Sequence, residues 1–140
     1  MNEYRFNEIY EDMTHEFHVT ITEEKQNLFR MVSGDTNPLH GDAMFASTRG
    51  FDGVVVFGML TASFYSQLVG VFLPGKYCLF HSIDTKFIKP VFIGDELLIS
   101  GTVKEKREKF RQLVIQAIIK NQHNEKVSKA IITVGVLDDE

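Results

Sequence analysis

The sequence has one cysteine, three prolines and no tryptophan among its 140 residues. A single cysteine, Cys78, excludes an internal disulfide and any paired-cysteine metal or redox site, so we expect a reducing, cytoplasmic compartment. The scarcity of proline, with 44% hydrophobic and 24% charged residues, excludes a disordered or collagen-like chain. One globular domain over residues 1–140 is expected, because a chain of this length buries a core of adequate size.

Basic charge is also scarce. Fifteen Lys and Arg residues against 19 Asp and Glu residues give a net charge of −4, and no basic stripe interleaved with aromatic residues is visible. Nucleic acid is therefore not an expected partner. The first five residues lack the cationic start and apolar stretch of an export signal, so none is expected.

No charged residue lies between Asp52 and Lys76, which makes this segment the one to test as a membrane span. Its helix-like part, residues 58–73, would reach only about 24 Å, less than the ~30 Å of a bilayer core. The valines before it favour a strand. We therefore predict a buried helix inside a soluble fold and no membrane partner.

The sequence around this helix alternates apolar and polar residues with a period of two, which predicts strands. Four strands are expected after Pro74, over residues 77–88, 96–103, 110–120 and 127–136, with the charged run 104–109 as a hairpin tip. Their short connections predict that they are antiparallel neighbours. A fifth strand is expected over 15–21, and a helix over 23–33 that Thr20 or Thr22 caps and Gly34 ends. The fold class is α+β, with an antiparallel sheet of about five strands curled round one apolar helix.

Polar residues that suit proton transfer are concentrated between Ser33 and Asp42. The Asn37-Pro38 turn can bring Asp35 and His40 to face one another as an acid/base pair. In the alternative interpretation, Asp35 only staples the turn and His40 is an ordinary surface residue. Composition alone favours that alternative.

Three sequence blocks resemble the MaoC-like dehydratase family, whose members include (R)-specific enoyl-CoA hydratases. They are Val-Ser-Gly-Asp-Thr-Asn-Pro-Leu-His at 32–40, Phe-Gly-Met-Leu-Thr-Ala-Ser at 57–63 and Phe-Ile-Lys-Pro-Val-Phe-Ile-Gly-Asp at 87–95. The resemblance covers roughly residues 15–137. It implies the hot dog fold, in which a sheet wraps a central helix, and a homodimer or higher homo-oligomer.

The resemblance also implies roles for single residues. Asp35 and His40 would be the catalytic dyad that holds one water, and the backbone N–H of Gly58 would bind the thioester oxygen. Phe57 stands where many relatives carry His, so any polar contact of that position with the substrate is lost. Ser66 matches a position near the acyl chain, although it could instead hydrogen-bond to its own helix. No metal and no cofactor is expected.

The expected function is the hydration of trans-2-enoyl-CoA to (3R)-3-hydroxyacyl-CoA, or the reverse dehydration, with an acyl-CoA or acyl carrier protein thioester as partner. The alternatives are a (3R)-hydroxyacyl-acyl carrier protein dehydratase and a non-catalytic hot dog binding subunit. A hot dog thioesterase is disfavoured, because residues 53–75 contain no Asp or Glu.

Overall fold

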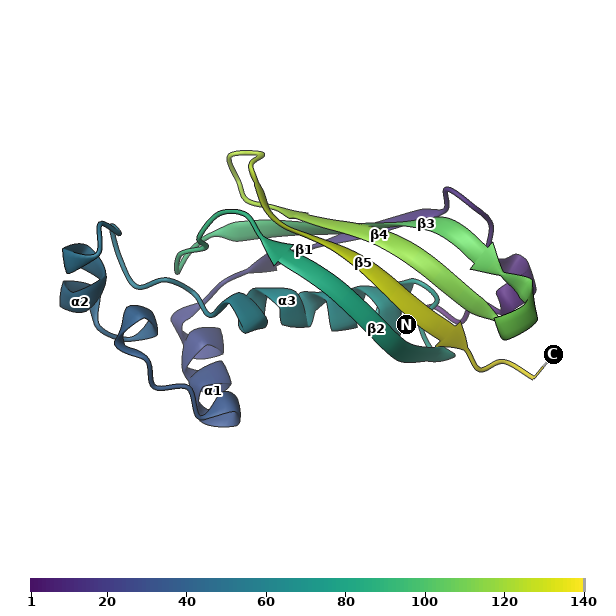
Figure 1. Cartoon of the computed structure of the whole chain (residues 1–140), viewed down its shortest axis with the longest axis horizontal. Helices are drawn as coiled ribbons and strands as arrows, with labels where there is room; N and C mark the ends of the chain where they lie inside the picture. The colour runs from purple at the N-terminus through teal and green to yellow at the C-terminus, as the bar shows by residue number, and fades with distance from the viewer. Residues whose placement is uncertain (140) are drawn as a thin grey trace.

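Five antiparallel strands form one curved sheet over a central helix in the computed structural model, which describes residues 1–139 (Figure 1). The strands are β1 (Thr14–Thr20), β2 (Cys78–Phe87), β3 (Glu96–Arg107), β4 (Gln112–Lys120) and β5 (Lys126–Val136). Their order across the sheet is β1-β3-β4-β5-β2. The α+β class and the strand number agree with the prediction.

The helix under the sheet is α3 (Gly58–Gln67), which continues as the π-helical turn η3 (Leu68–Phe72). Alternate residues of β3, β4 and β5 point toward it and are fully buried, as in Leu97, Ile99 and Val103 of β3. Tyr65 of α3 donates a hydrogen bond of 2.8 Å to the buried Ser128 of β5. The predicted helix over 58–73 is thus confirmed as the one that the sheet wraps.

Helix α1 (Glu23–Ser33) has the bounds that the sequence predicts. The Thr22 side chain accepts a hydrogen bond from the backbone N–H of Lys25, which satisfies one free N–H of the first turn. Gly34 ends the helix with φ of 71°, a left-handed conformation that glycine adopts without a steric penalty.

The prediction that consecutive strands are neighbours is wrong for β2 and β3. β2 pairs with β5, and two strands separate it from β3. Three strand spacings amount to about 14 Å, and the eight residues 88–95 can span roughly 26 Å, so a short connection does not require adjacent strands. This connection runs past the start of α3, where the Val56 N–H donates to the Val91 carbonyl (2.8 Å) and Val55 forms an isolated bridge with Phe92.

The expected hairpin tip at 104–109 is also displaced. β3 extends to Arg107 and pairs with β4 beyond a register shift after Val103. The charged residues therefore continue the strand, because the hydrogen bonds of a ladder need only the backbone.

Two short helices that the sequence did not predict follow α1. They are η2 (Pro38–His40) and α2 (Ala43–Thr48), where the Asp42 carboxylate caps α2 by accepting from the N–H groups of Met44 and Phe45. α1 and α2 extend to one side of the sheet, near the N-terminal end of α3 (Figure 1). No helix within residues 1–139 is long and apolar enough to cross a membrane.

Candidate active site

A cavity of about 260 Å³ lies at the N-terminal end of α3. Its lining residues are His40, Val55, Val56, Gly58, Thr61, Phe87, Ile88, Lys89, Pro90, Val91 and Val127. Most of these residues are apolar, and the polar side chains among them belong to His40, Thr61 and Lys89. Gly58 places the start of α3 at the same cavity. Such a cavity suits a small ligand with an apolar part and one reacting polar group.

His40 is half-buried, and its ring has a fixed hydrogen bond. The Nδ1 atom lies 2.7 Å from the carbonyl oxygen of Val55. A carbonyl oxygen only accepts, so Nδ1 carries the proton and donates it. In the neutral ring the lone pair is therefore on Nε2, which is the atom free to take a proton from a ligand or water.

The Phe57 ring packs against the face of the His40 ring. The two ring centroids are 4.2 Å apart, and Phe29 of α1 packs on Phe57 at 5.1 Å. Phe57 is 2% exposed and is not among the residues that line the cavity. In this chain its side chain contacts the catalytic candidate rather than the space for the substrate.

Gly58 is the first residue of α3, so its N–H has no acceptor within the helix and carries the partial positive charge of the helix dipole. A Cβ at this position would lie 3.3 Å from the Phe87 ring, which is a tight contact. Glycine therefore allows Phe87 to pack closely and leaves the backbone open to the cavity. The packing role and the donor role are compatible.

Asp35 is exposed and does not line the cavity. Its carboxylate accepts a hydrogen bond of 3.0 Å from the N–H of Asn37 and so closes the turn. Across residues 1–139 no hydrogen bond or ion pair joins Asp35 to His40. For Asp35 the contacts are those of the stapling alternative, whereas His40 is more than an ordinary surface residue.

Ser66 is exposed and lies outside the cavity. Eight residues after Gly58, it is turned about 80° around the helix, whereas Thr61 is turned about 60° the other way. Ser66 shares with Met59 and Ser63 a stripe of α3 that the chain leaves exposed. The structure therefore does not bring Ser66 to the other candidate residues.

Gln26, which lies in α1 and is 2% exposed, was not among the residues predicted from the sequence. Its Nε2 atom donates to the carbonyl oxygens of His40 (3.1 Å) and Val55 (3.2 Å), and its Oε1 accepts from the N–H of Phe57 (3.3 Å). Arg30, one turn later, donates to the same His40 carbonyl (2.8 Å). The only available signal was the spacing i, i+3, i+4 of Gln26, Phe29 and Arg30, which places them on one helix face.

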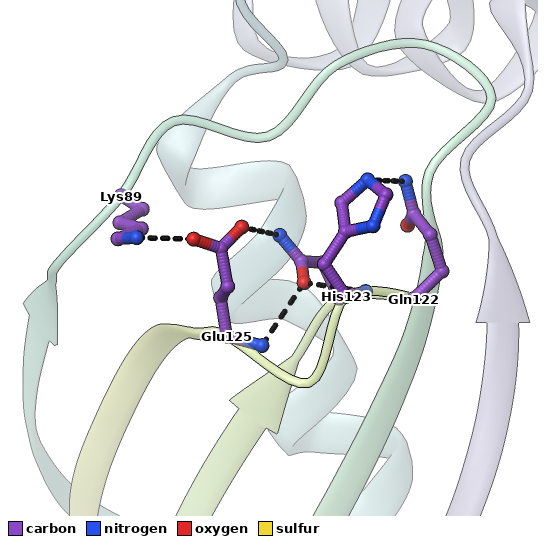
Figure 2. Close-up of polar contacts among 5 residues, drawn as sticks. Lys89, Gln122, His123 and Glu125 are labelled. Carbon is purple, nitrogen blue, oxygen red and sulfur yellow. Dashed lines mark hydrogen bonds and ion pairs between the residues drawn. The ribbon is translucent and has the colours of Figure 1, made fainter.

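Lys89 lines the cavity from the connection between β2 and β3, and it is tied to the hairpin between β4 and β5 (Figure 2). Its ammonium pairs with Glu125, which also accepts from Asn121, and these contacts hold the pKa of the Glu125 carboxyl below its usual range. Gln122 of the same hairpin donates to Asp95 at 2.9 Å. Both ends of the connection between β2 and β3 are thus bound to one hairpin.

Comparisons with known proteins agree with this geometry. An (R)-specific enoyl-CoA hydratase of Aeromonas caviae is 44% identical over 80 residues, which are 57% of this chain and 60% of that protein. One of Rhodospirillum rubrum is 36% identical over 106 residues, 73% of this chain and 74% of that protein. The solved structure of the unliganded R-hydratase PhaJ1 from Pseudomonas aeruginosa is 27% identical, covers 96% of this chain and 86% of its own, and has a TM-score of 0.90.

The sheet that wraps α3 is thus the hot dog fold that the resemblance implied. The model of the MaoC like domain matches residues 5–126, most of the described chain. The chain belongs to the MaoC-like domain family.

Proposed function

We propose that this chain hydrates trans-2-enoyl-CoA to (3R)-3-hydroxyacyl-CoA and catalyses the reverse dehydration. The observation that carries the proposal is one cavity that contains a histidine with an available Nε2 and the first residue of a helix. The first group exchanges a proton and the second binds an oxygen on which negative charge develops. The names of the relatives from Aeromonas and Rhodospirillum support the same reaction.

The reaction follows from these positions. In hydration, His40 Nε2 takes one proton from a water molecule while the water oxygen bonds to C3. The electrons of the C2–C3 double bond move toward the thioester carbonyl, whose oxygen accepts a hydrogen bond from the Gly58 N–H. The imidazolium then delivers its proton to C2, so that one water has been added and His40 is neutral again.

For Asp35 we propose an orienting role, in which its carboxylate accepts the second O–H of the same water. The carboxylate has the capacity, since one of its two oxygens is used by the Asn37 N–H. Phe57 fixes the His40 ring at one side, and for Ser66 we keep only a contact with the far end of a long acyl chain.

We further propose that the protein forms a homodimer. We also propose that it lies in the cytoplasm, because its single cysteine is unpaired, as is usual in a reducing compartment. β2 is one of the two edge strands of the sheet, and its Ile83 and Phe87 are 40% and 50% exposed. They pair with Ile132 and Ser128, which are fully buried, so they point to the side of the sheet that carries α3. Ile83 and Phe87 thus make the β2 edge an exposed apolar edge of the kind that a second copy covers, and Met59 of α3 is a further exposed apolar residue, 62% accessible.

The experiment that tests the proposed function is the incubation of the purified chain with crotonyl-CoA, followed by the loss of the enoyl absorbance. We expect hydration that depends on enzyme concentration. A parallel assay with crotonyl-acyl carrier protein tests the alternative carrier. Binding of acyl-CoA without turnover of either thioester would instead identify a non-catalytic subunit.

A further inference from the structure

Gln26 is a buried amide whose hydrogen bonds all end on the backbone that carries the candidate site. Its three contacts are the carbonyl of His40, the carbonyl of Val55 and the N–H of Phe57, on segments that are 14 to 31 residues away in sequence. A buried polar side chain in a helix otherwise costs stability, so its complete use by one site points to a role there.

Each contact bears on a different part of the proposed chemistry. The Val55 carbonyl is the acceptor that holds the Nδ1–H of His40, so Gln26 fixes the group that selects the tautomer. Gln26 and Arg30 both donate hydrogen bonds to the His40 carbonyl, which fixes the backbone of the residue that carries the imidazole. Phe57 immediately precedes Gly58, so its N–H contact fixes the start of α3.

We infer that Gln26 is a positioning residue. It holds the His40 imidazole in its Nδ1–H tautomer and fixes the position of that ring relative to the Gly58 N–H. This inference rests on the proposed function for its kinetic consequence but not for its structural one. A small misplacement of a proton-transfer group lowers the chemical rate far more than it lowers affinity for the substrate. The effect is therefore expected in kcat rather than in KM.

The test uses two substitutions in the full-length protein. Gln26→Met has a similar volume and removes all three hydrogen bonds, whereas Gln26→Glu keeps an acceptor for the Phe57 N–H and loses the two donated bonds. Glu24→Met is the matched control, since Glu24 is exposed on the same helix. We expect kcat per folded molecule for crotonyl-CoA to fall roughly 10- to 100-fold in both Gln26 variants, with KM changed by less than about twofold. The control keeps the wild-type values.

Nitrogen NMR of the His40 ring shows which ring nitrogen carries the proton. A purely structural role of Gln26 would leave this signal unchanged. In the neutral ring of the wild-type protein, the proton is expected on Nδ1 and not on Nε2, whereas Gln26→Met is expected to show a mixture of the two tautomers. Unchanged His40 signals, or a rate loss that only follows the folded fraction in thermal unfolding, would overturn the inference. If the wild type does not hydrate crotonyl-CoA, the proposed function fails, and the NMR result still decides the role of Gln26.

Discussion

The Nδ1 atom of His40 donates a hydrogen bond to the carbonyl oxygen of Val55 over 2.7 Å. Val55 precedes α3 and His40 follows α1, so this contact joins the two segments on which the proposed chemistry depends. It also decides which ring nitrogen reacts. Predictions about the site follow from that assignment.

His40 and Asp35 have different proposed roles, and the loss of either side chain should lower turnover. His40→Ala should lower turnover of crotonyl-CoA by about 10²–10⁴, the usual range for a positioned acid or base. Asp35→Asn should fall in the same range if its carboxylate orients the water. Circular dichroism must show retained folding in both variants. Near-normal turnover by folded Asp35→Asn would leave Asp35 with the turn contact alone.

Phe57→His introduces the residue that the family resemblance implies for this position. If the Gly58 N–H binds the thioester oxygen, this change should alter turnover by less than about tenfold, or ~1.4 kcal/mol of barrier. It should also reduce the free energy of unfolding by about 1–3 kcal/mol, because a polar ring replaces a buried one. Steady-state kinetics and denaturant unfolding measure the two effects. If the wild type is inactive on every enoyl thioester and Phe57→His activates it, the chain is a non-catalytic binding subunit and Phe57 is the reason that it lacks activity.

The exposed apolar edge predicts the state of association. Light scattering at micromolar concentration should give about twice the 16.0 kDa of one chain. Ile83→Asp places a charge on the β2 edge and should shift the protein toward the monomer. Tyr10→Asp changes another large exposed residue, 62% accessible and outside the β2 edge, and should leave the state of association unchanged. A wild-type monomer would refute the dimer.

Substitution of Thr61 by an apolar residue of the same shape should stabilise the protein. Its Oγ1 atom is buried without a hydrogen-bond partner among residues 1–139, and an isosteric apolar group removes that penalty. Thr61→Val should raise the melting temperature by about 2–4 °C. The Thr85 hydroxyl makes hydrogen bonds with Ser128 and with the Lys129 carbonyl, so Thr85→Val should give no such gain. A lower melting temperature for Thr61→Val would reveal a partner of its hydroxyl.

Local signals predicted much of the fold. Thr22 and Gly34 set the ends of α1, because a cap and a left-handed residue act within one turn. The partner of β2 could not be predicted, since its pairing with β5 depends on how the chain crosses the sheet and not on the length of the connection.

The site was predicted only in part. His40 and Gly58 were found by motif, and both line the cavity. Gln26 was missed because a glutamine in a helix has the same sequence signature whether it faces solvent or a buried backbone. The exposure of Ser66 could not be predicted, because its position around α3 depends on which stripe of that helix the sheet covers. Its contact with the acyl chain stays a proposal.

The most direct test of the account is the dehydration of pure (3R)- and (3S)-3-hydroxybutyryl-CoA, measured as the appearance of the enoyl absorbance. We expect the wild type to dehydrate the (3R) thioester only, and we expect this activity to fall by about 10²–10⁴ in His40→Ala. Equal rates with both stereoisomers, or a rate with the (3R) thioester that His40→Ala leaves unchanged, would contradict it.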